Sequence, residues 1–450
     1  MDRRVFIQSL AAASLTGTTG VLASPPRTRA LSSWFYNAAL GLFVHWGPCS
    51  VAEVEISWSM YRNSNGPNLY WPPEKYLALA DQFDPQDYDP DKWLEAAARA
   101  GFKYTAFVTR HHDGYTMWPS KYAEFGTRTK MHGRDLVRPF VEACRRHGLK
   151  VGFYYSPTDW SFCPKGWPYR GWPRAEPDFL HTDPPRVAGL PRFVDLKQED
   201  YDKYFPIFFE HMKAQLTELM TNYGKIDLLW WDGLDWPPGI DIRGKELDDY
   251  VRKLQPGIVI NDRYVPTRGT RDLGDYNTDY EAKDPANRPE GAWEQCAPMC
   301  GGWSYRGVKA RCQPASYLIE RLVRNRAWGG NFLPNFGPRA DGTMPPEYYA
   351  ICDEMAAWMK HSAVSIYDIE PGPYPDRSTC PVTVKGNTWY VHFVDFQRRA
   401  AKLKGVGAPK SAVLLRTGKA VAWRAEEDGI LLIPATDDFT ANDDVVAVTW

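Results

Sequence analysis

The chain has 450 residues, with 19 Trp and 25 Tyr, and 54 basic against 55 acidic side chains leave a formal net charge of −1. This balance excludes the basic surface that holds a nucleic-acid backbone or an anionic membrane, so we expect no nucleic-acid partner. The length predicts one large and one small domain rather than three equal ones. So many aromatic rings either fill a wide core or provide flat faces for sugar rings.

Residues 1–23 resemble a twin-arginine export signal. Arg3 and Arg4 precede an apolar run from Leu10 to Leu22 that is too short to span a bilayer. A small-residue cleavage site follows at Val21-Leu22-Ala23. We therefore expect a periplasmic or secreted protein, the alternative being an uncleaved N-terminal helix. Later segments are too polar to cross a membrane, so we expect no membrane span.

Apolar runs alternate with helical periodicity over residues 31–369. This alternation predicts an α/β fold, a (β/α)8-like barrel with a parallel sheet. The predicted strands are 42–44, 104–109, 150–155, 226–231 and 258–260, and the predicted helices are 90–100, 133–147, 205–223, 245–254, 316–328 and 345–361. The strand spacing exceeds that of a compact barrel, so long loops are inserted, and residues 164–191 form one of them.

The pattern changes after Glu370-Pro371-Gly372-Pro373. Short alternating runs then follow at 382–384, 389–394, 413–415 and 445–448, with turn residues between them. They predict a small antiparallel β-sandwich domain over residues 370–450.

Eight cysteines are scattered along the chain, so they do not indicate a dense disulfide framework. Cys296 and Cys300 lie close together and Cys312 follows, but neither a second tight pair nor a nearby His completes a zinc motif. We expect buried thiols or one local disulfide.

Polar residues at the carboxyl ends of barrel strands form the active site in this architecture. Here those positions hold His45, His111, His112, Tyr155, Asp232 and Arg263. Acidic groups, neutral donors and many indoles fit a sugar pocket better than a phosphate or metal pocket. A retaining glycosidase needs one carboxylate to attack the anomeric carbon and a second, about 5 Å away, to protonate the leaving oxygen.

Asp232 is the candidate nucleophile because it follows the aromatic run Leu229-Trp230-Trp231. An Asp-Gly pair after a strand is also a turn signal, which is the alternative interpretation. Near aromatic walls a carboxylate stays ionised only if donors hold it, and His111, His112 and Arg263 can serve.

Two adjacent histidines raise the question of a metal, with His45 or Asp113 as further ligands. Consecutive strand residues point to opposite faces, and a fourth ligand does not follow at a recognisable spacing. We therefore expect neutral imidazoles that bind sugar hydroxyls, and neither a metal nor a cofactor.

The ordered motifs resemble the α-L-fucosidases of glycoside hydrolase family 29, from about Trp34 to Ile369. They are Gly41-Leu42-Phe43-Val44-His45-Trp46-Gly47, His111-His112-Asp113-Gly114-Tyr115, Tyr154-Tyr155-Ser156, Leu229-Trp230-Trp231-Asp232-Gly233, Asn261-Asp262-Arg263 and Asn335-Phe336-Gly337-Pro338-Arg339-Ala340-Asp341-Gly342. The resemblance implies a retaining mechanism on fucosylated glycans, without metal or cofactor, with Asp232 as nucleophile. It implies sugar binding by His45, Trp46, Trp58, His111, His112, Tyr154 or Tyr155, Trp231 and Arg263.

Two positions depart from the family pattern. Many members carry a Glu-Trp pair where this chain reads Ser57-Trp58, with Glu53 and Glu55 just upstream. The acid/base lies in a variable loop after the Asn-Asp-Arg strand, here 274–281.

We choose Glu281 as the acid/base, because a Thr precedes it and a Pro follows it as in the family loop. Asp279 is the second choice and Glu294 the third, although Glu294 fits better at the start of the next strand. The alternative for Glu281 is a solvated loop acid. Two other functions fit the same motifs: a glycosidase for another sugar such as a galactoside, or a carbohydrate-binding relative without turnover.

Overall fold

The structure is a computed structural model, and it describes residues 32–60, 70–162, 198–232, 241–264, 273–394, 400–435, 437, 439–440 and 442–450. The predicted export signal at 1–23 and the predicted long loop at 164–191 lie outside the described residues.

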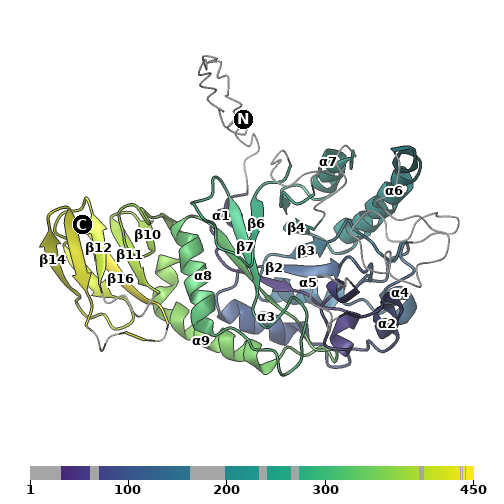
Figure 1. The fold of residues 1–450 in the computed structure, drawn as a ribbon, viewed down its shortest axis with the longest axis horizontal. Helices are drawn as coiled ribbons and strands as arrows, with labels where there is room; N and C mark the ends of the chain where they lie inside the picture. The colour runs from purple at the N-terminus through teal and green to yellow at the C-terminus, as the bar shows by residue number, and fades with distance from the viewer. Residues whose placement is uncertain are drawn as a thin grey trace, which may run out of the picture.

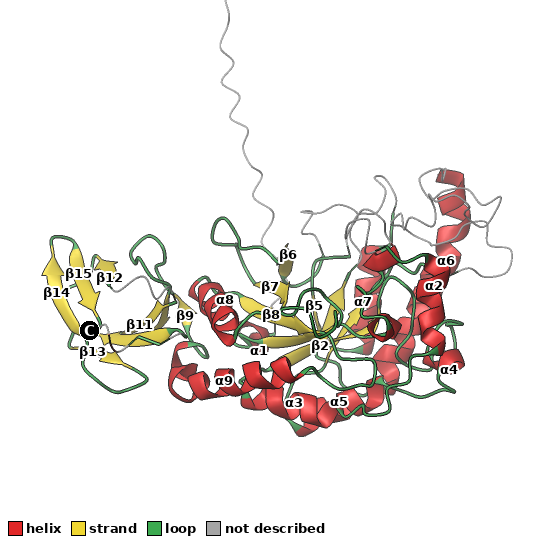
Figure 2. Cartoon of the chain, turned by 60° about the horizontal axis from the view of Figure 1, so that its bottom comes forward, coloured by secondary structure: helices red, strands yellow, loops and turns green. Residues whose placement is uncertain are grey.

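In the described part of the chain, one sheet of eight parallel strands curves into a barrel, with helices on its outer surface (Figure 1, Figure 2). The strands are β1 Gly41–Val44, β2 Tyr104–Arg110, β3 Gly152–Tyr155, β4 Leu228–Trp231, β5 Val259–Ile260, β6 Asn277–Glu281, β7 Trp293–Pro298 and β8 Asn331–Phe336. Their order is β5-β4-β3-β2-β1-β8-β7-β6, and a parallel bridge from Asn261 to Tyr276 links the two outer strands. The predicted (β/α)8-like barrel is confirmed.

The helices are α1 Ser33–Tyr36, α2 Pro73–Ala78, α3 Pro90–Arg99, α4 Thr127–Lys130, α5 Val137–Arg146, α6 Gln198–Asn222, α7 Gly244–Leu254, α8 Ala315–Ala327 and α9 Pro346–Ser362. Six of them, α3 and α5 to α9, follow the predicted periodic segments, whereas the short helices α1, α2 and α4 were not predicted. The start of α3 illustrates the local cause: Pro90 occupies its first turn, and the Asp89 side chain accepts a hydrogen bond from Asp91 N at 3.2 Å.

Strands β6, β7 and β8 were not among the five predicted strands. Residues 274–281 were expected in a loop, because the family resemblance implied a variable loop after the Asn-Asp-Arg strand. Parallel pairing with β7 nevertheless makes residues 277–281 a strand, with Tyr280 opposite Gln295 and Glu281 opposite Cys296. Glu281 therefore ends a barrel strand, and Glu294 lies at the start of the next one, as expected.

The C-terminal strands form two antiparallel sheets beside α8 and α9, at one end of the molecule (Figure 1). One sheet has the order β13-β16-β11-β10-β9 and the other β12-β15-β14. Their bounds are β9 Glu370–Pro371, β10 Val382–Lys385, β11 Thr388–Phe393, β12 Ala401–Lys404, β13 Ser411–Leu414, β14 Ala422–Glu426, β15 Gly429–Ile433 and β16 Asp444–Thr449. Val382 and Val446 of one sheet share a buried core with Leu403 and Leu432 of the other, so the predicted β-sandwich is present. The domain limits 31–369 and 370–450 stay a prediction.

The cysteines include both kinds that the sequence left open. Cys300 and Cys312 form a disulfide, and the free cysteines of the described residues are buried: Cys49, Cys144, Cys296, Cys352 and Cys380. Within the described ranges, each helix is too short or too polar to cross a membrane.

Candidate active site

Polar side chains converge where the barrel strands end. Asp232 directly follows β4, His45 follows β1, and His111 and His112 follow β2. Glu281 is the last residue of β6. Because the carboxyl ends of parallel strands meet at one rim, residues far apart in sequence come together there.

The carboxylate of Asp232 is held by two hydrogen-bond donors and lies beside a histidine. The Tyr154 hydroxyl donates to Oδ2 at 2.6 Å, Arg263 Nη2 donates to Oδ1 at 2.9 Å, and His112 Nε2 lies 3.4 Å from Oδ2. Burial alone would raise the pKa of Asp232, but the Arg263 charge, His112 and the Tyr154 hydrogen bond outweigh it and lower that pKa. The group is therefore ionised at neutral pH, as a nucleophile must be.

Arg263 joins the two candidate carboxylates through a single nitrogen. Its Nη2 also donates to Glu281 Oε2 at 3.1 Å, so the two bonded carboxylate oxygens lie at most about 6 Å apart. Burial by itself would lower the pKa of Arg263, but Asp232 and Glu281 raise it. The side chain of Glu281 is 40% exposed, against 17% for Asp232. One carboxylate is thus enclosed and the other faces the opening, where a leaving group would lie.

Two histidines of the pocket are uncharged at neutral pH. His45 Nδ1 lies 2.7 Å from Asn335 Oδ1, and His111 Nδ1 lies 2.6 Å from Ser57 Oγ. Burial lowers the pKa of His45 to about 3 and that of His111 well below its usual value. Neutral imidazoles of this kind can bind hydroxyl groups without charge repulsion.

Aromatic side chains border the third histidine. The rings of Trp58 and Trp160 lie 5.1 and 5.5 Å from the ring of His112, measured between centroids. His112 Nδ1 itself lies 2.6 Å from Ser156 Oγ. The structure therefore brings Trp58 beside this histidine of the cluster.

Strand alternation decides between two adjacent tyrosines. Tyr154 points into the barrel and bonds Asp232, whereas the Tyr155 hydroxyl bonds Gln215 at 2.8 Å on the outer side, where the Arg110 guanidinium lies over its ring. Tyr155 is thus held among structural groups rather than in the pocket.

The same alternation places Trp231 and Trp46, both expected to bind the sugar, outside the pocket. Trp231 points outward, where its Nε1 donates to Asp248 at 3.2 Å. The inward residue is Trp230, whose ring stacks on Tyr154 at 5.6 Å and lies under the Arg263 guanidinium at 4.7 Å. Trp46 is also buried away from the cluster, and its Nε1 donates to Arg339 O at 2.9 Å.

The two other acids that the sequence offered have different neighbours. Asp279 accepts a hydrogen bond from Asn277 Nδ2 at 3.1 Å. Glu294 is buried inside the barrel, where Trp230 Nε1 donates to it at 2.9 Å and the Tyr104 hydroxyl also donates. Of the three acids, Glu281 is the one bonded to the arginine that holds Asp232.

Ser57 and Glu55 have partners other than the two carboxylates. The Ser57 hydroxyl supports His111 and accepts from Asp113 N at 2.9 Å. The Glu55 carboxylate is buried and accepts hydrogen bonds from Trp303 N and Ser304 N. Glu55 therefore anchors the loop that carries Trp303, because its oxygens bind two backbone amides and lie beside the Arg306 guanidinium.

One group of possible metal ligands occurs among the described residues: His111, His112 and Asp232, with ligand atoms within 4.8 Å of one another. Arg263 already places a positive charge on an Asp232 oxygen. A cation added beside it would be repelled, so this group fits an anionic nucleophile better than a metal ligand.

Sequence reasoning missed four residues of the pocket: Trp160, Trp230, Trp303 and Asn335. The period of two along β4 could have identified Trp230 from Asp232. Trp303 lies in an irregular loop, and its ring centroid is 5.0 Å from that of His45. Neither its position nor the Asn335–His45 bond leaves a local pattern in the sequence.

A barrel with paired carboxylates, neutral imidazoles and aromatic walls at its rim defines a glycoside hydrolase. The family model described as Alpha-L-fucosidase matches residues 18–363. The chain therefore belongs to the α-L-fucosidase family, as its motifs indicated.

Named relatives agree with this assignment. The chain is similar to the tissue α-L-fucosidase of Mus musculus, with 28% identity over 82% of this chain and 78% of the relative. The solved α-L-fucosidase isoenzyme 1 from Paenibacillus thiaminolyticus matches with a TM-score of 0.76 and 28% identity, over 92% of this chain and 97% of the other. An α-L-fucosidase from Bacteroides thetaiotaomicron matches with a TM-score of 0.74 and 25% identity, over 92% and 93%.

Proposed function

We propose that this enzyme removes terminal α-L-fucose from glycans by double displacement with retention of configuration. The observation that carries the proposal is the shared arginine. Arg263 Nη2 bonds both Asp232 and Glu281, which limits the two oxygens to a separation of about 6 Å. Inverting enzymes need roughly 6.5–9.5 Å between their carboxyl groups to accommodate a water molecule, so this spacing favours a retaining pair.

In the first step, Asp232 Oδ attacks the anomeric carbon, and Glu281 transfers its proton to the leaving glycosidic oxygen. The bond between the anomeric carbon and that oxygen breaks, and a glycosyl ester of Asp232 forms. In the second step, Glu281 takes a proton from water, and the resulting hydroxide displaces Asp232 from the anomeric carbon. Two inversions leave the sugar in its original configuration.

The other pocket residues bind and orient the sugar. His45 and His111 stay neutral because burial lowers their pKa values, so they can donate to or accept from ring hydroxyls. Trp303, which is half-buried, supplies apolar surface for the carbon faces of the sugar ring, whereas the buried Trp230 supports Tyr154 and Arg263. Tyr154 and Arg263 hold the nucleophile in place for attack.

The decisive experiment is a panel of nitrophenyl glycosides, with NMR of the first-formed sugar anomer. We expect hydrolysis of the α-L-fucoside, with the α-anomer of L-fucose appearing before mutarotation. Preference for an α-L-galactoside would assign a different sugar, and first release of the β-anomer would contradict the retaining mechanism. Binding of L-fucose by calorimetry without hydrolysis of any panel member would assign a carbohydrate-binding protein.

We further propose that the chain is exported through the twin-arginine pathway. Arg3 and Arg4 with the apolar run that follows support this proposal, and the Cys300–Cys312 disulfide fits an oxidising compartment. Replacing both arginines by lysine is expected to leave uncleaved precursor inside the cell, as measured by fractionation and mass spectrometry. Normal cleavage of that variant would exclude this route.

A further inference from the structure

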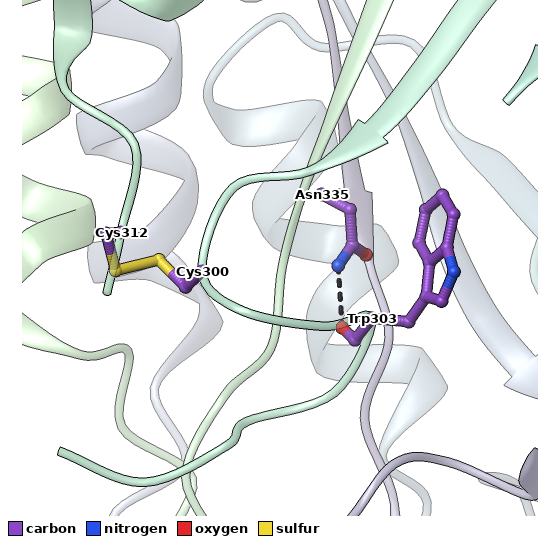
Figure 3. The surroundings of a disulfide bond; sticks show 4 residues. All are labelled: Cys300, Trp303, Cys312 and Asn335. Carbon is purple, nitrogen blue, oxygen red and sulfur yellow. Dashed lines mark hydrogen bonds between the residues drawn. A yellow bond between two sulfur atoms is a disulfide. The ribbon is translucent and has the colours of Figure 1, made fainter. Parts of the chain in front are cut away.

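A loop closed by a disulfide borders the sugar pocket. Cys300 and Cys312, 12 positions apart, lie just after β7 and just before α8, and they pair as a short antiparallel bridge (Figure 3). Gln313 N donates to Met299 O at 2.7 Å just outside the sulfurs. Residues 301–311 form neither helix nor strand, so the shape of this loop depends on the points at which it is tied.

One of these tie points lies on the pocket. Asn335 Nδ2 donates to Trp303 O at 2.6 Å, as the dashed line in Figure 3 marks, and Asn335 Oδ1 lies 2.7 Å from His45 Nδ1. The Trp303 ring also packs on His45, with centroids 5.0 Å apart. Both the backbone and the ring of Trp303 therefore reach a histidine of the pocket.

A second tie point is the Glu55 carboxylate. Trp303 N and Ser304 N donate to it at 3.0 Å, and Arg306 Nη1 lies 3.4 Å away. The backbone of Gly337 packs closely against the same loop, since a Cβ there would lie 2.3 Å from the backbone nitrogen of Tyr305. The loop is thus held by one covalent bond, the disulfide, and otherwise by hydrogen bonds and close packing.

We propose that the Cys300–Cys312 disulfide is a positioning element of the sugar site, which holds Trp303 against His45 so that sugar affinity depends on the cross-link. The inference rests on the proposed function, because it takes the pocket to be the sugar site. A cross-link removes open conformations from an irregular loop. Without it, conformations in which Trp303 leaves His45 become populated. Only the molecules that keep Trp303 in place bind the sugar well, so the apparent affinity falls in proportion to their fraction.

The test compares a variant that carries both Cys300→Ala and Cys312→Ala with a matched control variant. The control, Cys144→Ala with Cys352→Ala, loses two buried thiols from helices α5 and α9 without losing a cross-link. With an aryl α-L-fucoside, we expect the loop variant to raise KM about 10-fold and to change kcat less than about 3-fold, while the control keeps both constants. A purely structural disulfide would lower Tm and leave KM unchanged, and that result would overturn the proposal.

A double-mutant cycle shows whether the disulfide acts through Trp303. In a Trp303→Ala background, breaking the disulfide is expected to raise KM by less than about 2-fold, because the positioned ring is already gone. An undiminished 10-fold rise in that background would also overturn the proposal.

Hydrogen exchange provides a readout that needs no substrate. Loss of the disulfide is expected to speed exchange in a peptide covering residues 301–311, where the Trp303 and Ser304 amides are bonded to Glu55. Unchanged exchange there would contradict the inference whether or not the wild-type chain cleaves fucosides. Absence of hydrolysis by the wild type would instead count against the proposed function alone.

Discussion

Two carboxylates in the barrel, Asp232 at the rim and Glu294 inside, are connected through one indole, that of Trp230. Trp230 stacks on Tyr154, which donates to Asp232, and its own Nε1 donates to Glu294. Burial acts on both acids, yet the pKa of Asp232 is lowered and that of Glu294 is raised to about 7. The difference lies in the partners, because Asp232 has the Arg263 cation while the groups that donate to Glu294 are neutral.

The comparison shows how one barrel interior supports two kinds of acid. Neutral hydrogen bonds reduce the cost of burying a charge, and a guanidinium in direct contact reverses it. The rim carboxylate is therefore available as an anion for attack, and the inner carboxylate acts as a polar support for Trp230.

Removal of the rim anion should have the largest effect. Asp232→Ala is expected to lower kcat for an aryl α-L-fucoside by at least about 10⁴-fold, because the group that forms the covalent bond is gone. Circular dichroism and Tm should show a folded protein. Near-wild-type hydrolysis by a folded variant would remove Asp232 from the mechanism.

Glu281→Ala should lower kcat by about 10²–10⁴-fold, the range typical of a lost acid/base. Azide should restore turnover and yield the α-configured fucosyl azide, since a small anion can attack the glycosyl-enzyme without a general base and this second inversion restores the original configuration. Asp279→Ala is the matched control, because Asp279 lies on the same strand and bonds Asn277 instead of Arg263. Azide rescue of the control rather than of Glu281→Ala would transfer the acid/base role to Asp279.

Arg263→Met tests the cation itself, and we expect kcat/KM to fall about 10²-fold, a loss of roughly 3 kcal/mol. Because Arg263 lowers the pKa of Asp232, its removal should raise that pKa, so the acid limb of the kcat/KM profile should move to higher pH. Arg252→Met is the control, since Arg252 also contacts two carboxylates, Asp248 and Asp275, but outside the pocket. An unmoved acid limb in Arg263→Met would contradict the assigned electrostatic role.

The sequence predicted the elements that depend on periodicity. Five strands, the six long helices and the C-terminal sandwich follow from alternating or helical apolar patterns. Strand β6 has no such pattern and was not predicted. It is a strand because it pairs with β7, not because of its composition. Asp232 and Arg263 could be identified because both follow apolar strands.

The remaining pocket residues could be predicted only with side-chain direction or long-range contacts. The choice of Trp231 over Trp230 placed the wrong indole at the rim, although a period of two from Asp232 selects Trp230. Trp303 and Glu55 meet across 248 positions in the chain, and local sequence carries no record of such a contact.

The smallest effect on activity, and a clear effect on stability, is expected for Glu294→Gln. The amide can still accept from Trp230 Nε1 and donate to the Tyr104 oxygen, so kcat should stay within about 3-fold of wild type. In the wild type, the folded state keeps the Glu294 proton up to about pH 7, whereas the unfolded chain loses it near pH 4.5. Between these values the folded state binds more protons, so the free energy of unfolding falls as pH rises.

Gln does not titrate, so the stability of Glu294→Gln relative to wild type should increase by on the order of 3 kcal/mol between pH 4 and pH 8. Urea denaturation at both pH values measures this difference. Glu218→Gln is the control, because Glu218 also accepts from an indole, that of Trp118 at 2.9 Å, but outside the barrel interior. The difference in the free energy of unfolding between wild type and Glu294→Gln could instead be the same at both pH values. Glu294 would then be as ionised in the folded state as in the unfolded chain, which would contradict the contrast with Asp232.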